Sequence, residues 1–465
     1  MQIEPILALT AAVITIGAAW VLSFPSETTK RDDEFPNLPG FPIIGNLLDI
    51  LGPNLKIKVH ETKGPAFLRI PGLPRTLVFD DLALLRQVLG RSLPSFSIVG
   101  DPLLGLPHGI FSAVGIEHKR LRNLGVRGLS KSVLLAQFEH IKSHAEEQLV
   151  KMATENKPII PTLFLQMYAY KTICVIMAGS DSEQLKRLES LFEPITIAGR
   201  GGQARLLPKW LDFAGSIEKG TMATDLVIKT CIEIAIERRA AMEAGKEFSD
   251  GLSALIDARD SDGSFLSDFE IASFFFTMIS AGLDTTGQQS STMFYFLANS
   301  ISQQDLAALR SEVNQSFAME SEATISALPL LDAFVKESMR IFPMIPQGNR
   351  VLTDDIVLDG KKVPAGTHIG PLRDRGFLVD NPDEFRLDRF VGDDALDKKR
   401  TIEFIPFGMG ERMCIGIHLA RLEMKVLIAT ALRSYEIVKG PGSPTFAYYP
   451  FKTVKSYVTV KPLKL

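Results

Sequence analysis

The sequence predicts one large, mainly helical domain with a small β-rich lobe, preceded by a single transmembrane helix. Its 465 residues contain no Gly/Ser-rich linker, low-complexity run or internal repeat after residue 45, although a length of about 150 residues per domain would allow more than one domain. Apolar residues recur at helical spacing through most of residues 135–260 and in 267–299, 328–342 and 419–432. Strand-like runs are short, and a long uncharged stretch stands at the N-terminus.

That N-terminal stretch, residues 5–24, has no charged side chain and consists mostly of Ile, Leu, Ala and Val. About 20 such residues are enough to cross a bilayer as a helix. Lys30 and Arg31 follow it and only Glu4 precedes it, so the positive-inside tendency places the N-terminus on the lumenal side and the rest of the chain in the cytosol. A cleaved signal peptide is the alternative, but it would need a basic start and a better cleavage site than the sequence near residue 24.

Prolines mark the connection to the main domain. Pro36, Pro39 and Pro42 each fix φ and bias the preceding residue toward extended geometry. We therefore expect a transmembrane anchor over residues 1–25, a proline-rich hinge over 26–45 and the main domain over 46–465.

Composition excludes some classes of function. The net charge is −3 and no basic tail dominates, so nothing points to nucleic acid. The chain has three cysteines, an odd count without a paired framework, which argues against an oxidising compartment. Cys174 stands in an apolar run and Cys231 in an amphipathic helical pattern, and both are expected to be inert packing groups.

The early part of the main domain reads as a small β-hairpin followed by a short helix. Residues 66–70 and 76–79 are rich in strand-forming side chains and are separated by a Pro/Gly turn, which predicts a hairpin. A short helix is expected over 81–89, followed by a loose apolar segment over 95–115. Within residues 135–260 we expect the helices to break at the prolines near 160 and at the glycine pair 201–202.

A long apolar helix is expected over residues 267–299. Ser267 and Glu270 form the sequence pattern of a capping box at its start. Gly282, Asp284 and Thr285 stand in its middle, where each costs up to about 1 kcal/mol relative to alanine. A helix that weakens its own middle usually does so for a functional site.

One window near the C-terminus contains a cysteine suited to bind a metal. Phe407, Gly410, Arg412, Cys414 and Gly416 fall together just before a helical pattern. The positive end of the helix dipole and the nearby arginine favour thiolate over thiol. A thiolate held in this way is a soft axial ligand for haem iron. The alternative is a buried structural cysteine, which is the commoner role of a single intracellular cysteine.

The same window resembles the haem-binding signature of the cytochrome P-450 superfamily, phenylalanine-x-x-glycine-x-arginine-x-cysteine-x-glycine. The resemblance implies the cytochrome P-450 fold, haem b (iron protoporphyrin IX) as cofactor and Cys414 as the iron ligand. It also implies cofactor contacts for Phe407, Arg412 and Gly416.

Other motifs resemble the same family in the same order. Residues 281–286 are similar to its oxygen-activating motif, which implies a proton-relay role for Asp284 and a hydrogen-bonding role for Thr285. The resemblance further implies that His118, Arg122 and Arg350 bind the haem propionates. For the first two, a solvated basic helix is the alternative, because residues at i and i+4 share a helix face in either case.

A structural triad is also implied by the resemblance. Glu337 and Arg340 match the family's glutamate-x-x-arginine, and Arg389 matches its third member, so that together they brace the cysteine segment. Between residues 367 and 373 the chain is several residues shorter than the family's pattern, which affects the expected pocket near His368.

The function implied is that of a haem-thiolate monooxygenase in the endoplasmic reticulum membrane, single-pass, with residues 46–465 as a catalytic domain on the cytosolic face. It would insert one oxygen atom from O2 into a lipophilic substrate of the sterol, terpenoid or fatty acid class. Electrons would come from a separate NADPH-dependent reductase or a cytochrome b-type donor. The alternatives are a haem-thiolate isomerase or dehydratase acting on hydroperoxides, and a non-enzymatic haem sensor. We expect the reductase to dock on a basic surface formed by Lys119, Arg120, Lys398, Lys399, Arg400, Arg421 and Lys425.

Overall fold

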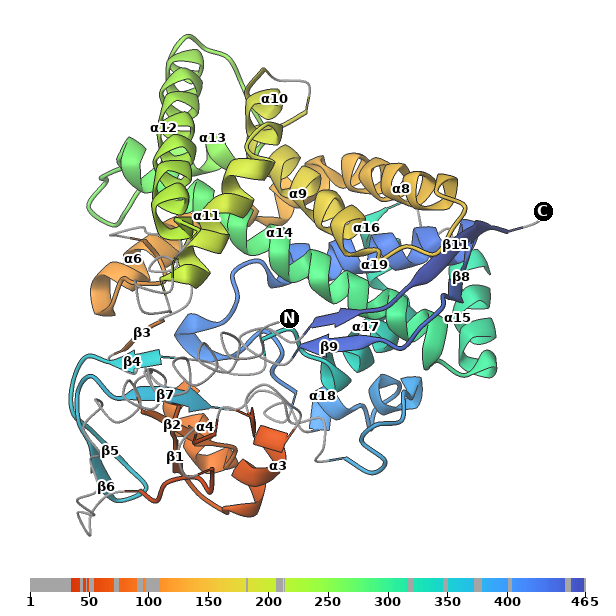
Figure 1. Ribbon diagram of the computed structural model, residues 1–465. Coiled ribbons are helices and arrows are strands. Elements are labelled where there is room, and N and C mark those ends of the chain that lie inside the picture. Colours follow the sequence, from red (N-terminus) through yellow and green to blue (C-terminus); the bar gives the residue numbers. More distant parts are fainter. Residues whose placement is uncertain are drawn as a thin grey trace, which may run out of the picture.

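A large helical body and a smaller β-rich lobe make up the protein (Figure 1). The structure is a computed structural model, and it describes residues 35–41, 45–46, 48–49, 54–70, 75–89, 95–97, 109–180, 183–205, 212, 214–315, 321–345, 350–371, 379–399, 404–447 and 453–463. The expected transmembrane anchor over residues 1–25 lies outside these residues. Within the ranges just given, no helix is long and apolar enough to cross a membrane.

The β-rich lobe contains a mixed sheet with the strand order β1-β2-β7-β4-β3. β1 and β2 form the expected antiparallel hairpin, with Ala66 opposite Val78. β2 pairs with β7 in parallel, β7 pairs with β4 antiparallel, and β4 pairs with β3 antiparallel. The lobe's elements are α3 (Asn54–Glu61), β1 (Ala66–Leu68), β2 (Thr76–Phe79), α4 (Leu82–Leu89), β3 (Ser95–Ser97), β4 (Arg350–Leu352), β5 (Ile356–Leu358), β6 (Lys361–Val363) and β7 (His368–Pro371).

The helical body is formed by the chain on both sides of β4–β7 and surrounds one long helix. Its elements are α6 (Gly115–Gly125), η1 (Val126–Leu129), α7 (Lys131–Ala136), α8 (Phe138–Thr154), α9 (Thr162–Ala178), α10 (Glu183–Glu189), α11 (Phe192–Ala204), α12 (Ser216–Glu243), α13 (Gly251–Ile256), α14 (Asp268–Asn299), α15 (Gln303–Gln315), α16 (Glu322–Ser326), α17 (Pro329–Ile341), η4 (Leu387–Phe390), α18 (Leu396–Lys399), η5 (Gly410–Arg412) and α19 (Ile417–Ser434). Two antiparallel strand pairs close the chain: β8 (Tyr435–Lys439) with β11 (Val458–Pro462), and β9 (Thr445–Ala447) with β10 (Thr453–Lys455).

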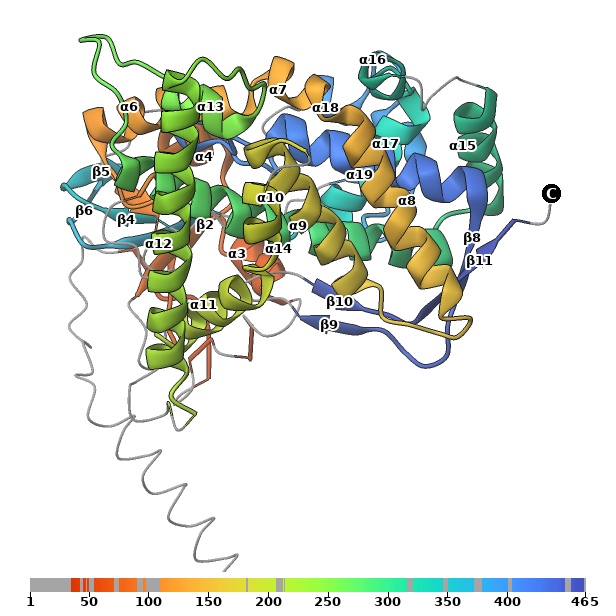
Figure 2. The same ribbon diagram turned by 90° about the horizontal axis from the view of Figure 1, so that it is seen from above.

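The long helix is α14, which crosses the helical body (Figures 1 and 2). The capping box at its start is confirmed: the Ser267 side chain accepts from the Glu270 N–H, and the Glu270 carboxylate accepts from the Ser267 N–H. Phe274 packs against Gly125 of α6, where an added Cβ would fall 1.9 Å from the Phe274 ring. Only glycine permits this approach, which holds α6 close to the first half of α14.

The glycine pair at 201–202 does not break a helix, contrary to the expectation from sequence. α11 continues through both residues to Ala204. A Cβ added at Gly201 would lie 2.5 Å from the Cα of Gly220, so the glycines allow α11 and α12 to cross with their backbones in contact. The close helix contact offsets the poor helix propensity of glycine.

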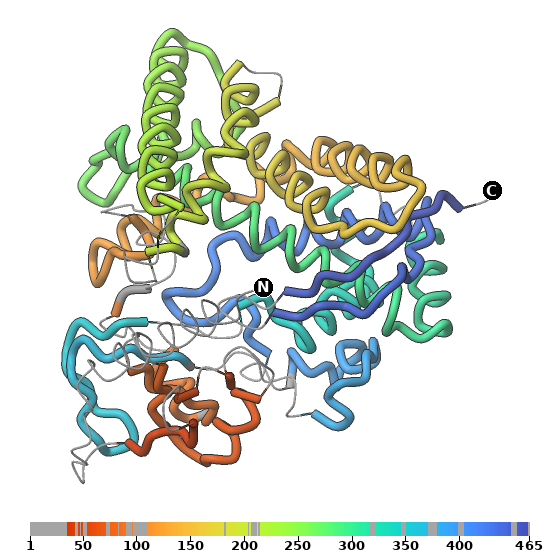
Figure 3. Tube along the Cα trace, in the orientation of Figure 1, coloured from red at the N-terminus to blue at the C-terminus, as the bar shows by residue number. Residues whose placement is uncertain are grey.

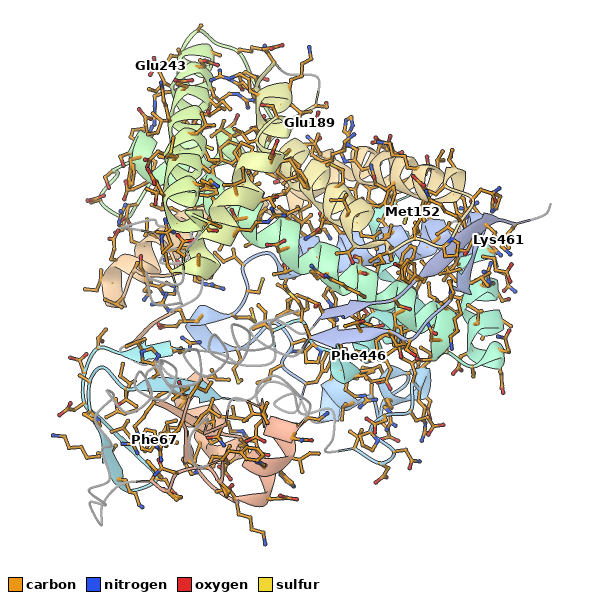
Figure 4. All side chains as sticks on the ribbon, viewed as in Figure 1. Phe67, Met152, Glu189, Glu243, Phe446 and Lys461 are labelled. Atoms are coloured by element: carbon orange, nitrogen blue, oxygen red, sulfur yellow. The ribbon has the colours of Figure 1, made fainter. Side chains whose placement is uncertain are left out.

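The proline segment is attached to the lobe where the structure describes it. Phe35 and Leu38 are buried, and hydrogen bonds join Leu38 N–H to the Phe67 carbonyl at 2.9 Å and Phe67 N–H to the Pro36 carbonyl at 2.8 Å. The proline segment therefore runs beside β1 and is held to it by backbone hydrogen bonds. At the other end of the chain, Phe446 of β9 (labelled in Figure 4) packs edge-on against Tyr295 of α14.

Candidate functional site

The cysteine loop (residues 404–416) leads into α19 and runs between the helical body and the β-rich lobe (Figure 3). Gly408 and Gly410 have φ angles of 73° and 69°, a left-handed backbone that favours glycine. These turns fold the loop so that the Cys414 N–H donates to the Phe407 carbonyl at 3.0 Å. The thiol then stands just before the N-terminus of α19, where the helix dipole favours thiolate.

The three cysteines of the chain differ sharply in their surroundings. Cys414 is exposed, whereas Cys174 and Cys231 are fully buried. Burial raises the pKa of both buried thiols, that of Cys231 to about 12. Cys414 is therefore the only cysteine of this chain that can present a thiolate to a ligand.

Space beside the Cys414 sulfur is open. Gly416 is the N-cap of α19, and a Cβ added there would meet only the Cys414 Sγ and a Leu129 methyl, each at 4.0 Å. Phe407 is half-buried and packs on the helical core. The loop is thus supported from one side and clear next to the sulfur, which is the arrangement that a flat ligand needs.

Arg122 of α6 is a cation that lies beside the cysteine. Its Nη1 donates to the Met413 carbonyl at 2.7 Å, directly before Cys414. Burial lowers the pKa of the Arg122 guanidinium, and the neighbouring Cys414 and Glu411 oppose that shift. Arg122 therefore places a positive charge beside the Cys414 thiol, as a stabilised thiolate requires.

Arg412 binds backbone carbonyls of β3 and of the residues just before α6. Its guanidinium donates to the carbonyls of Ser95 at 2.9 Å and Ile110 at 3.0 Å, and also to that of Ala113. These bonds connect the cysteine loop to the start of α6. Arg412 thus contributes a fixed positive charge whose position is set by four carbonyl groups, including that of Phe111 at 3.5 Å.

His118 lies buried within this group of cations. Burial first, and then the charges of Arg412, Arg122 and Arg350, together lower the pKa of His118 to about 4. Glu411 is the acidic side chain that acts on His118, and its effect is opposite. The histidine is therefore neutral at pH 7 and can donate one ring N–H to an acceptor. Three guanidinium groups and a neutral donor form a site for an anionic ligand.

Asp284 and Thr285 stand in the middle of α14. Thr285 Oγ1 donates to the Ala281 carbonyl at 2.7 Å within the helix. The Asp284 side chain is exposed, yet desolvation raises its pKa. A carboxyl group that faces an enclosed space within the protein is accessible to solvent and is also surrounded by protein atoms that raise its pKa. Its Oδ1 accepts a hydrogen bond from Gln166 Nε2 at 2.9 Å.

The structure brings Glu337, Arg340 and Arg389 together. Arg340 donates to both Glu337 oxygens, at 2.6 and 2.8 Å, and Arg389 Nε donates to Glu337 Oε1 at 3.3 Å. Arg389 also holds the carbonyls of Asp380 and Asn381. The triad therefore joins α17 to residues 380–389, the stretch that precedes the cysteine loop.

The expected basic docking surface is only partly present. Lys425 is buried and pairs with Asp332 at 2.8 Å, so its inclusion was wrong. Arg120 is half-buried and binds Glu117 and Glu270. Lys119 is exposed on α6, and Lys398 is exposed but donates to the Gly392 carbonyl. Arg421 is half-buried and pairs with Asp332 at 3.6 Å. Arg400 lies outside the described residues, as does the side chain of Lys399.

Two polar contacts of this site were not predicted from sequence. Gln166 reaches Asp284 from α9, and no spacing rule connects residues so far apart in the chain. Glu423 of α19 is fully buried, with Thr286 as its hydrogen-bond partner, and burial raises its pKa well above the usual range. Both Glu423 and Lys425 of α19 are buried together with the apolar residues of that helix.

Comparison with known proteins decides the family. A model of the cytochrome P450 family matches residues 36–452. The chain belongs to the cytochrome P450 family. It is 26% identical to cytochrome P450 76T24 of Catharanthus roseus, over 94% of this chain and 93% of that protein. It is 25% identical to flavonoid 3'-monooxygenase of Petunia hybrida, over 87% of this chain and 86% of that protein.

Solved P450 structures share the fold. A structure titled retinoic acid bound cyanobacterial CYP120A1 matches with a TM-score of 0.77 at 20% identity, covering 92% of this chain and 100% of that one. The cytochrome P450DA heme domain matches with a TM-score of 0.79 at 18% identity, covering 92% and 97%. The mainly helical P450 fold with small sheets is therefore confirmed.

Membership establishes the reaction class and the cofactor. P450s are oxidoreductases of the monooxygenase type, and they bind haem through a cysteine thiolate. The chain is thus a P450 monooxygenase with haem as its cofactor. Its site fits that group: one exposed thiol with open space beside it, and a set of cations around a neutral histidine for the two haem carboxylates.

Proposed function

We propose that this P450 is a membrane-anchored monooxygenase that acts on a lipophilic substrate and takes electrons from a separate NADPH-dependent reductase. The single observation that supports it most is the exposed Cys414 at the N-terminus of α19, in a chain whose other thiols are buried. In this proposal Cys414 is the iron ligand. The anchor over residues 1–25 and the endoplasmic reticulum as its membrane remain part of the proposal.

His118, Arg122 and Arg350 would hold the haem carboxylates. Arg350 is buried on β4 of the β-rich lobe, and its positive charge lowers the pKa of His118 on α6 of the helical body. The proposed haem-carboxylate site therefore takes residues from both the lobe and the body. Neutral His118 would donate a hydrogen bond without adding a fourth positive charge. Arg122 would also keep the cysteine loop in place through the Met413 carbonyl. When bound, haem supplies the oxidising chemistry that inserts one oxygen atom from O2 into the substrate.

Asp284 and Thr285 would deliver protons to the reacting site. A carboxyl group with a raised pKa is protonated for a larger share of the time near neutral pH, and can therefore act as a donor. The Thr285 hydroxyl bonds the Ala281 carbonyl in the structure, and the same oxygen can accept a hydrogen bond from water. Together they would form a short relay from Asp284 Oδ to the Thr285 hydroxyl.

A lipophilic substrate is supported by the relatives. One similar structure was solved with retinoic acid bound, and one relative is named as acting on a flavonoid. An anchored enzyme would meet substrates dissolved in the membrane, which favours a sterol, terpenoid or fatty acid. Difference spectra of the ferric protein against a panel of these lipids test the class. Product formation that requires reductase and NADPH tests the reaction, whereas turnover without them would favour an isomerase or dehydratase.

Replacement of Thr285 by alanine should uncouple the enzyme. The hydroxyl that orders the relay is lost while Cys414 is untouched, so haem content and substrate binding should remain normal. Product per NADPH should fall by about 10²-fold or more, because positioned proton transfer is typically worth that much, and hydrogen peroxide should appear in its place. Thr292→Ala is the matched control, since Thr292 donates to the Gln288 carbonyl in the same manner two turns further along α14. Full coupling in the Thr285 variant would contradict the relay.

Charge reversal at Lys119 should slow electron transfer from the reductase. Lys119 is exposed on α6, close to the cysteine loop that Arg122 contacts from the same helix. Complementary charges raise the association rate, so Lys119→Glu should slow reduction severalfold at low salt and little at high salt. Lys461→Glu is the control, because Lys461 lies on β11 at the opposite end of the molecule from α6 (Figures 1 and 4). Stopped-flow measurements give the rate of haem reduction in both variants at two salt concentrations. Equal reduction rates in Lys119→Glu and Lys461→Glu at low salt would exclude this docking site.

A further inference from the structure

The helix α9 crosses α14 at the level of Asp284. A Cβ added at Gly287 would lie 2.7 Å from the Cα of Gln166, so the two backbones are in contact there. One turn along, Thr162 and Ser291 share a hydrogen bond of 2.9 Å. This close crossing is what lets the Gln166 amide reach the Asp284 carboxyl at 2.9 Å.

No charged side chain acts on Asp284 among the residues that the structure describes. Its pKa responds to burial, which raises it, and to the Gln166 hydrogen bond, which lowers it. Titratable groups of the helices packed on α14 bind partners other than Asp284. On α9, Lys171 pairs with Glu147 and Tyr168 donates to the Glu423 carbonyl. Arg239 of α12 pairs with Asp268, Glu337 of α17 binds Arg340, and Glu423 of α19 bonds Thr286. Gln166 is therefore the one polar contact that the structure gives the Asp284 carboxyl.

We propose that Gln166 is a positioning residue for Asp284, and that an uncharged amide at this place keeps the Asp284 carboxyl able both to take up and to release a proton. This inference rests on the proposed relay role of Asp284. An amide has both a donor and an acceptor end, so by turning over it can bond the carboxylate or the protonated carboxyl. Lysine or arginine in its place could only donate, and would stabilise the charged form alone.

Two substitutions at Gln166 should act in opposite directions. Gln166→Lys places a positive charge beside Asp284, which favours the carboxylate and lowers the pKa. Gln166→Leu removes the hydrogen bond to the charged form and leaves burial unopposed, which raises the pKa. Each shift should be about 1 pH unit or more, because these are the sizes that a nearby charge or a hydrogen bond produces. A role limited to helix packing would not give shifts of opposite sign.

The experiment measures protonation directly in the ferric holoenzyme, without turnover. The infrared band of the protonated Asp284 carboxyl is identified as the band missing from Asp284→Asn, and its midpoint is followed with pH. We expect the midpoint to fall in Gln166→Lys and to rise in Gln166→Leu, and the alkaline limb of coupled product formation to move in the same two directions. Thr162→Val breaks the neighbouring bond between α9 and α14 without touching Asp284, so its midpoint should not move.

The outcomes separate this inference from the proposed function. Midpoints that stay unchanged, or that move in the same direction in both Gln166 variants, would overturn the positioning role, and so would an equal shift in Thr162→Val. Full coupling in Asp284→Asn would overturn the relay, while the infrared midpoints would still report whether Gln166 controls the carboxyl. Loss of coupling in Asp284→Asn together with opposite midpoint shifts supports both.

Discussion

Cys414→Ala should abolish the thiolate-type spectrum of the bound haem. The thiol is the only exposed one in the chain, and it stands where the α19 dipole and Arg122 both favour the charged form. Alanine has no lone pair to offer the iron, and no other cysteine is close enough to the surface to replace it. The reduced, carbon monoxide-bound protein should therefore lose the absorption band that is typical of thiolate ligation.

The other two cysteines provide matched controls. Cys174→Ala and Cys231→Ala each remove a buried thiol whose pKa is raised by burial, so the spectrum should be unchanged in both. Each leaves a small cavity at a fully buried position, which should lower stability without affecting ligation. A normal carbon monoxide spectrum in Cys414→Ala would overturn the assignment of this residue as the ligand.

The parts of the fold that sequence could predict are those with a local cause. The capping box of Ser267 and Glu270 and the length of α14 follow from side chains within one segment, and the structure agrees with both. The hairpin was predicted from a local Pro/Gly turn signal in the sequence, and β1 and β2 do pair antiparallel. The pair 201–202 was predicted wrongly because the glycines serve a contact with Gly220, which local propensity does not reveal.

The site residues also divide into those that a local pattern predicts and those that depend on tertiary packing. Motif residues such as Cys414 are recognisable because their spacing is fixed by a single loop. Gln166 was missed because its contact with Asp284 depends on how two distant helices cross. Lys425 was assigned to the surface from its charge, but it lies in the buried part of α19, and Asp332 of α17 neutralises it. Burial of charged residues of this kind is decided by tertiary packing and not by the residue type.

Glu337→Gln should destabilise the protein by about 3–5 kcal/mol, the cost of removing one partner from a buried ion pair. Glu337 is fully buried, and Arg340 is nearly so. The carboxylate accepts from Arg340, from Arg389 and from the Arg386 N–H at 3.0 Å. Glutamine keeps the size of the side chain but removes the charge, so two guanidinium groups lose their counter-ion away from water.

The measurement is urea unfolding of the purified protein, followed by tryptophan fluorescence and by haem absorbance. Asp388→Asn is the control, because it breaks the ion pair with Arg386 in the same segment, where both side chains are exposed. That exposed pair should contribute no more than about 1 kcal/mol. Because the triad holds residues 380–389 against α17, Glu337→Gln should also release haem at a lower urea concentration than Asp388→Asn does. Equal stability in the two variants would show that the triad does not brace the segment before the cysteine loop.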